Sequence, residues 1–196
     1  MTDPIVSSGF LQELKKATAR LHQELEELLI SKTLISPEVS VQDYLTYLKR
    51  MNDVIVEVES EVFPLVQHEI PDVGGRRKSG LFQKDFQALG VIRETKPNLL
   101  GIWKPESSVG FAMGIMYVIE GSTLGGRMIY KHVQKFLDLD ADSGAAYFAG
   151  YSENTGNFWK EFMATLARHE EKYGNSQEII NGANHAFGVI GNHLLR

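Results

Sequence analysis

The sequence predicts an all-α fold in which residues 1–196 form a single domain. Apolar residues recur at three- and four-residue steps along most of the chain, as they do on the buried face of a helix. No run alternates apolar and polar residues with the period of two that a half-buried strand requires. The composition, with 43% hydrophobic and 23% charged residues, is typical of a folded chain with one large core.

The first predicted helix has its apolar line from Phe10 to Leu28, with Ser7 or Ser8 as the expected N-cap. The second runs from about Ser40 to Phe63, and the proline that follows is expected to end it.

A basic, glycine-rich loop, PDVGGRRKS, follows at residues 71–79, and its three basic side chains are expected to be solvated. Beyond it, helices are predicted at about Gly80–Leu89, from Ser107 or Ser108 to Phe136, at Asn154–Lys172 and at Ser176–Leu195. The stretch from Gly90 to Ser107 contains two prolines and is expected to be irregular.

Composition excludes several classes of function. The net charge is −5, so the chain has no electrostatic footprint for nucleic acid. Because the chain has no cysteine, it has no disulfides, thiolate nucleophiles or zinc–thiolate sites. The N-terminus lacks the basic and apolar regions of a signal peptide, and no apolar run is long enough to span a bilayer. We therefore expect a cytoplasmic protein that does not bind membranes.

The segment LKKATARLHQELEELL at residues 14–29 is the first that indicates chemistry. On a helix, Thr18, His22 and Glu26 are spaced four residues apart and share one face beside the apolar stripe. A neutral imidazole there could bind iron, with the carboxylate one turn on orienting its other nitrogen. A histidine that only makes a hydrogen bond at the edge of the core fits the same spacing, so both interpretations stay open.

The segment FAMGIMYVIEGSTLGGRMIYKHV at residues 111–133 is the second. It places Gly114, Gly121, Gly125 and Gly126 inside an apolar helix, where each glycine costs about 0.5–1 kcal/mol relative to alanine. Such a face allows close approach either by another helix or by a flat ligand. Together the two segments predict a planar group held between a ligating helix and a kinked, side-chain-free helix, an arrangement that suits heme.

The sequence resembles the heme oxygenase family, specifically its soluble bacterial members, including those paired with bacteriophytochromes. Residues 14–22, LKKATARLH, resemble the family's proximal motif, and residues 117–127, YVIEGSTLGGR, resemble the bacterial form of its distal glycine motif. Residues 159–162, WKEF, and 183–187, ANHAF, resemble two further heme-contacting segments.

The resemblance implies a role for each matching position. His22 would be the proximal iron ligand, Glu26 its partner, and Thr18 part of the proximal lining. Gly121, Gly125 and Gly126 would form the distal wall, with Gly121, Ser122 and Gly125 taking part in catalysis. Lys15 and Lys160 would pair with the heme propionates, and Phe187 would pack on the macrocycle. Tyr117 and Arg127 are further candidates for propionate contact because they lie beside the glycines.

The implied activity is oxidative cleavage of heme by O2 to biliverdin, CO and ferrous iron. A reductase or ferredoxin would supply electrons, a phytochrome is a possible acceptor of biliverdin, and the expected state is a monomer. One position departs from animal-type members, which have Asp where this chain has Ser122. A hydroxyl can hold water but has no charge, so the distal water network must be built differently.

The first alternative is a heme carrier or sensor on the same fold. A di-iron bundle would need Glu-x-x-His pairs, and no Glu has His three residues later. Glu57, Glu59 and Glu61 are instead expected on a solvated face. A thiaminase-type enzyme would need a cysteine nucleophile, and a helical interaction module would leave the glycines unexplained. Surface or capping roles are expected for the other five histidines, His68, His132, His169, His185 and His193.

Overall fold

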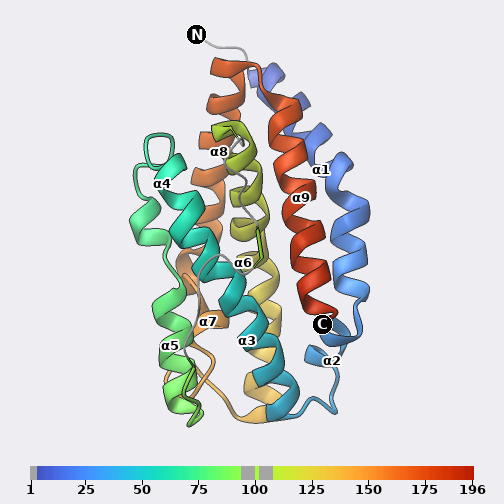
Figure 1. Ribbon diagram of the computed structural model, residues 1–196, viewed down its shortest axis with the longest axis vertical. Coiled ribbons are helices and arrows are strands. Elements are labelled where there is room, and N and C mark those ends of the chain that lie inside the picture. The colour runs from blue at the N-terminus through green and yellow to red at the C-terminus, as the bar shows by residue number, and fades with distance from the viewer. Residues whose placement is uncertain (1–3, 94–99, 102–107) are drawn as a thin grey trace.

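The computed structural model describes residues 4–93, 100–101 and 108–196, and the described residues form a helical bundle without strands (Figure 1). The all-α prediction is thus confirmed. The helices are α1 (Pro4–Glu27), α2 (Leu29–Leu34), α3 (Val41–Glu57), α4 (Phe63–Val66), α5 (Ser79–Ala88), α6 (Val109–Leu137), α7 (Ala146–Ala149), α8 (Thr155–Tyr173) and α9 (Ser176–Leu194). A π-helical turn, Val58–Val62, joins α3 to α4, and 3-10 turns lie at Val73–Arg76 and Ser152–Asn154. Among the described residues, none of the helices has an apolar stretch that could cross a bilayer.

Local capping explains three of the helix ends that matter here. Ser40 accepts a hydrogen bond from the Asp43 backbone N–H and its own N–H is bonded by the Asp43 carboxylate, which is a capping box at the start of α3. Ser108 caps α6 by accepting from the N–H of Phe111, as the sequence predicts. Gly174 ends α8 at φ 63°, a conformation that glycine adopts at little cost.

Two predicted boundaries differ from the structure. Helix α1 begins at Pro4, so Ser7 and Ser8 lie inside the helix and not at its cap. The second helix continues past Phe63 to Val66, although Pro64 lacks the N–H that an α-helix would use. The π-helical turn directly before the proline changes the hydrogen-bond spacing and lets the chain remain helical. The prolines Pro97 and Pro105 of the predicted irregular stretch lie outside the described residues.

Helix α6 is the centre of the bundle and packs on α9, α8 and α7. The contact with α9 is unusually close because two glycines interlock. A Cβ on Gly114 would lie 2.0 Å from the carbonyl oxygen of Ile179, and a Cβ on Gly182 would lie 2.0 Å from that of Phe111. Gly114 therefore serves a helix crossing, which is one of the two interpretations that the sequence leaves open.

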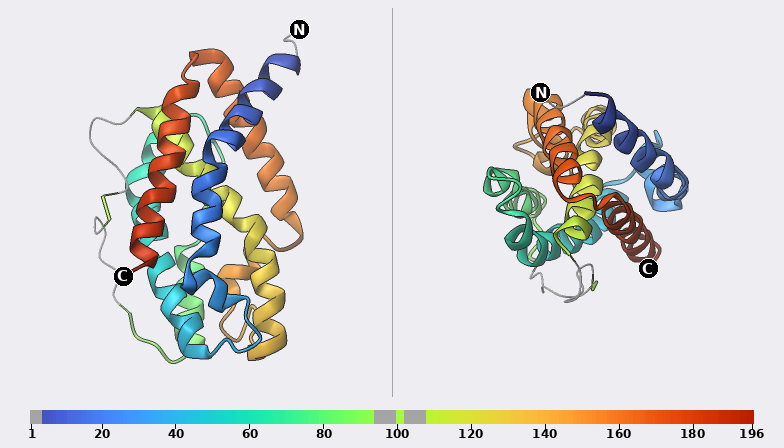
Figure 2. Two further views of the ribbon diagram at one scale, coloured as in Figure 1. Left: turned by 90° about the vertical axis from the view of Figure 1, so that its right-hand side faces the viewer. Right: turned by 90° about the horizontal axis from the view of Figure 1, so that it is seen from above.

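Helix α1 lies on the outside of the bundle against α9 and α8 (Figure 2). In the left view of that figure, α1 and α6 cross near the middle of the molecule and diverge toward the end at which α2 lies. Helix α6 is unbroken through all its glycines, and its axis changes direction part-way along its length in the same view. Most of the predicted site residues lie on these two helices.

Candidate functional site

His22 lies on α1 with 57% of its side chain exposed. Its ring stands edge-on to that of Phe187 on α9, with centroids 5.7 Å apart and an interplanar angle of 81°. The Nδ1 atom lies 3.7 Å from a carboxylate oxygen of Glu26, one turn further along α1. The structure thus brings together three of the predicted site residues, and the contact at Nδ1 leaves Nε2 available to a ligand.

Thr18 and Tyr117 connect α1 to α6 at the point where the helices cross. Thr18 is buried and its hydroxyl donates to the carbonyl of Leu14 at 2.8 Å. This hydroxyl lies near that of Tyr117, whose pKa is raised by burial. The sequence singles out both residues but not their contact with each other.

At the far end of α6, a second contact joins this helix to the loop that follows α2. There, a ring nitrogen of His132 lies 2.8 Å from the carbonyl oxygen of Ser36, just after α2. Tyr117 and His132 are 15 residues apart, which is about 22 Å along a helix. Both belong to one stripe of α6, whose members between them are Gly121, Leu124, Gly125 and Met128.

This stripe is open to solvent between its two ends. Leu124 is 42% and Met128 66% exposed, and nothing lies within 4 Å of a Cβ placed on Gly125. A Cβ on Gly121 would meet only the edge of the Trp159 ring, at 3.6 Å. On α1, His22 follows Thr18 by one turn and so faces the same way. We call the region of the surface that His22 and this stripe border the α1–α6 slot.

The remaining predicted residues do not all face the slot. Gly126 is buried with Phe148 3.5 Å from its Cβ position, so it faces away from the slot. Lys15 and Lys160 are exposed, on α1 and α8. The Arg127 guanidinium is about half exposed and lies 3.9 Å from Glu153. Ser122 donates to the carbonyl of Ile119 at 2.7 Å and lies near Tyr147.

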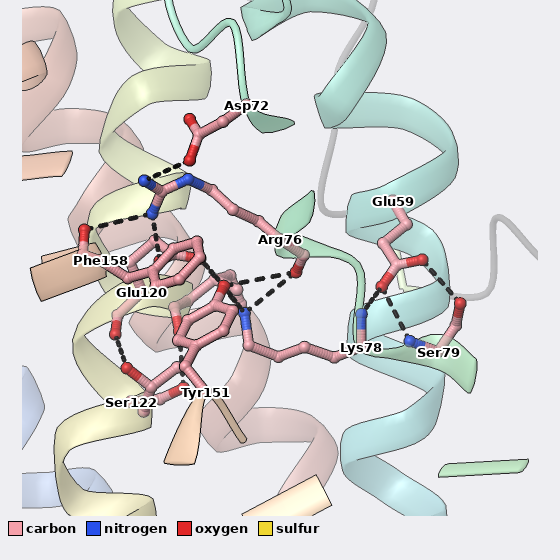
Figure 3. A network of polar contacts seen from close by, with 11 residues as sticks. Glu59, Asp72, Arg76, Lys78, Ser79, Glu120, Ser122, Tyr151 and Phe158 are labelled. Atoms are coloured by element: carbon pink, nitrogen blue, oxygen red, sulfur yellow. Dashed lines mark hydrogen bonds and ion pairs between the residues drawn. The ribbon is translucent and has the colours of Figure 1, made fainter. Parts of the chain in front are cut away.

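Behind the glycine stripe lies a buried charge network that sequence reasoning missed (Figure 3). Arg76 and Lys78, predicted to be solvated, are 1% and 2% exposed. The two cations meet Glu120, the residue before Gly121. Arg76 donates to one carboxylate oxygen of Glu120 at 2.7 Å, and the Lys78 ammonium to the other at 3.2 Å. Of the three basic residues, only Arg77 is exposed as expected.

The expected solvated glutamate face is likewise wrong. Glu57 is 2% and Glu59 4% exposed. Glu59 accepts hydrogen bonds from the backbone N–H groups of Lys78 and Ser79, at 2.5 and 2.9 Å, and Glu57 accepts from that of Leu100 at 2.7 Å. These carboxylates hold loops against the helix, which a pattern of charges two residues apart does not reveal.

Of the other histidines, His68 is exposed as expected, whereas His169 is 3% exposed and lies 3.1 Å from a Glu69 carboxylate oxygen. His132, His185 and His193 are partly buried. Across the part of the chain that the structure describes, no three His, Asp or Glu side chains gather as a metal site would require. A carboxylate-bridged iron pair therefore has no support there, whereas heme needs a single protein ligand.

Comparisons with known proteins point to one family. The family model described as heme oxygenase matches residues 102–194. The chain is 26% identical over 190 residues to the heme oxygenase PigA of Pseudomonas aeruginosa, covering 94% of this chain and 91% of the relative. It also superposes on the heme oxygenase of Neisseria meningitidis, with a TM-score of 0.76, 25% identity and coverage of 94% and 89%. The chain is therefore similar to heme oxygenases in sequence and in fold over nearly its full length.

A further heme oxygenase fold, that of heme oxygenase-1 from the cyanobacterium Synechocystis in complex with heme, matches with a TM-score of 0.69 at 18% identity, covering 95% of this chain and 90% of that one. At that identity the likeness concerns the fold. The same heme oxygenase architecture is thus found in this chain over nearly its full length.

Proposed function

We propose that this chain is a heme oxygenase, which binds heme in the α1–α6 slot, with His22 as the iron ligand, and cleaves it to biliverdin, CO and ferrous iron. Residues 1–196 act as one domain in this proposal. The observation that supports it most is the pairing of an exposed imidazole on α1 with an open stripe of α6 that has no side chain at Gly121 and Gly125.

The slot suits a flat, largely apolar guest. Its two ends are fixed by the Thr18–Tyr117 and Ser36–His132 contacts, and the distance of about 22 Å between them exceeds the width of a porphyrin. Exposed Leu124 and Met128 would be covered by such a guest, so binding would remove apolar surface from water.

His22 would bind the iron through Nε2, while Glu26 and Phe187 fix the ring. The carboxylate at 3.7 Å favours a proton on Nδ1, and the ring of Phe187 restricts rotation about the side-chain bonds. Both effects keep the lone pair of Nε2 pointing into the slot.

The propionates would meet Lys15, Lys160, Arg127 and Tyr117 at the mouth of the slot. Arg127 holds Glu153 only at 3.9 Å, and the two lysines are exposed, so each cation can turn toward a carboxylate with little to give up.

On the opposite side, the bare backbone at Gly121 and Gly125 would lie against the ring, and Ser122 would hold water there. Bound heme supplies both the iron that activates O2 and the ring that is oxidised. We propose a reductase or ferredoxin as electron donor, a phytochrome as a possible acceptor of biliverdin, and a monomer as the working form. The cytoplasmic location stays a prediction.

The test is addition of hemin to the purified chain, followed by a reductase or ascorbate in air. We expect a Soret band on binding and then its loss, with growth of the broad red absorption of biliverdin. A carrier or sensor on the same fold would keep the spectrum of intact heme through repeated reduction in air, and that result would reject the enzymatic function.

A further inference from the structure

The buried ammonium of Lys78 has no role in the function proposed above. Its Nζ donates to Glu120 at 3.2 Å, to the hydroxyl of Tyr151 at 2.7 Å and to the carbonyl of Arg76 at 3.3 Å. These contacts use all three ammonium hydrogens. The backbone N–H of the same residue is held by Glu59, so both ends of the side chain are fixed in place (Figure 3).

On the side of Lys78 that faces α6 there is a small hollow with room for water. The residues around it are Lys78, Ser122, Thr123, Gly126, Tyr147, Phe148 and Gly150. The Ser122 hydroxyl donates to the carbonyl of Ile119, and that of Thr123 to the carbonyl of Glu120, so both oxygens can accept from water. Tyr147 lies beside Ser122 at the same place.

Charged and titratable groups face Lys78 from each of the elements packed on it. Glu120 reaches it from α6 and Glu59 from the π-helical turn, while Arg76 lies on its own loop and Tyr151 precedes α8. Arg76 is in turn paired with Asp72 at 3.0 Å. Burial lowers the pKa of Lys78, and the charge of Glu120 opposes that change.

We propose that Lys78 is a positioning residue for proton delivery: the field of its fixed positive charge orients water in the hollow, and this water passes protons through the Ser122 hydroxyl to the glycine face of the slot. The inference rests on the proposed function. The step moves protons only, since Ser122 gives one toward the slot as it accepts one from the water, and solvent replaces the proton at the mouth of the hollow. The charge of Lys78 thus organises water in a chain that has Ser122, and no carboxylate, at this distal position.

The experiment compares Lys78→Met with the wild type as full-length heme complexes. We expect turnover to fall roughly tenfold to hundredfold, with a larger solvent deuterium isotope effect, while the Kd for hemin changes little. Separately from activity, the pH midpoint of the absorption change of the ferric heme complex should rise by about half a pH unit or more, because a nearby positive charge has been removed. The midpoint reports the field of the Lys78 charge, and the isotope effect reports the proton transfer, which a merely structural role would not change.

The matched control is Lys84→Met, which removes an exposed lysine that pairs only with Asp142 at the surface. It should leave turnover, isotope effect and midpoint unchanged. If Lys78→Met does not fold, Tyr151→Phe replaces it, since the ring can keep its stack on Phe158 at 4.2 Å while the hydroxyl is lost. Tyr151→Phe should slow turnover at least about threefold and enlarge the isotope effect.

If the wild type degrades heme but Lys78→Met leaves the midpoint and the isotope effect unchanged, the role of Lys78 is overturned. Where Tyr151→Phe is needed instead, an unchanged rate and isotope effect in that variant overturns it. Failure of the wild type itself to bind or degrade hemin would instead reject the proposed function, so the two failures are distinguishable.

Discussion

The rings of His22 and Phe187 meet edge to face, with centroids 5.7 Å apart, although the residues lie on α1 and α9 at opposite ends of the chain. An edge of one ring against the face of another is a favourable arrangement, and here it holds an imidazole that is otherwise more than half exposed. An exposed, oriented imidazole contributes little to the folded state itself, so its removal should affect function far more than stability.

His22→Ala should therefore abolish heme turnover. The unfolding free energy should change by less than about 1 kcal/mol, because the side chain is exposed and pairs only weakly with Glu26. Hemin titration followed by turnover in air measures the loss of function, and urea unfolding measures the change in stability. His68→Ala, which removes an exposed histidine distant in sequence from the slot, is the control. Normal turnover by His22→Ala would show that the ligand assignment is wrong.

Gly125→Ala should stabilise the protein and impair its function. Nothing lies within 4 Å of the added methyl group, and alanine is favoured over glycine in a helix by up to about 1 kcal/mol. The same methyl group would occupy the slot where a porphyrin is expected, weakening hemin binding roughly tenfold or more.

Thermal unfolding and hemin titration measure the two effects of Gly125→Ala. Gly156→Ala, on the first turn of α8 with equally open surroundings, is the matched control and should leave hemin binding unaltered. If Gly125→Ala bound hemin as tightly as the wild type, the stripe would not be the distal wall.

Gly182→Ala should destabilise the fold by at least about 2 kcal/mol. Its methyl group would lie 2.0 Å from the backbone carbonyl oxygen of Phe111, and a helix backbone cannot yield as a side chain does. Gly188→Ala, on the same helix with nothing within 4 Å, should instead be neutral or slightly stabilising. Urea unfolding of both variants gives the comparison, and equal stabilities would contradict the close crossing of α6 and α9.

The carboxylate of Asp85 should make stability depend on pH. It is fully buried and accepts from the N–H groups of Ala146 and Tyr147, at 2.6 and 2.9 Å, at the start of α7. Burial raises its pKa to about 6. Because the folded state then binds this proton more tightly than the unfolded state, the stabilising contribution is complete below about pH 4 and is lost as the pH rises through about 6.

The wild type should lose up to about 3 kcal/mol from this group between pH 4 and pH 7, relative to Asp85→Asn. Urea unfolding at several pH values in this range measures the difference between the two proteins, in which the other titrating groups cancel. Asn loses one acceptor oxygen, which lowers stability equally at every pH. Parallel pH curves for the two proteins would exclude the raised pKa.

Periodicity and caps predicted the long helices well because those signals are local. Ser108 begins α6, and α9 spans Ser176–Leu194 against a predicted Ser176–Leu195. The short helices α2 and α7 were not predicted, since segments of six and four residues are too short to show a period. The π-helical turn was missed because no local pattern distinguishes it from the α-helix that it continues.

The slot could be inferred from sequence only in part. The spacing of Thr18, His22 and Glu26 correctly predicts a shared face, but the same rule does not say that Gly126 turns toward Phe148. The charge network joins Arg76 to Glu120 across 44 residues, and no local pattern reports such a contact. One signal was available: Glu120 is a lone charge in an apolar helix, and a buried charge requires a partner.

The interlocked glycines of α6 and α9 have a consequence for motion. Each backbone occupies the volume that a methyl group would need on the other helix, so the two cannot slide or roll past one another without a collision. They behave as one rigid frame. Any widening that admits or releases a large flat molecule must therefore come from α1 swinging outward or from the C-terminal half of α6 flexing beyond Gly121.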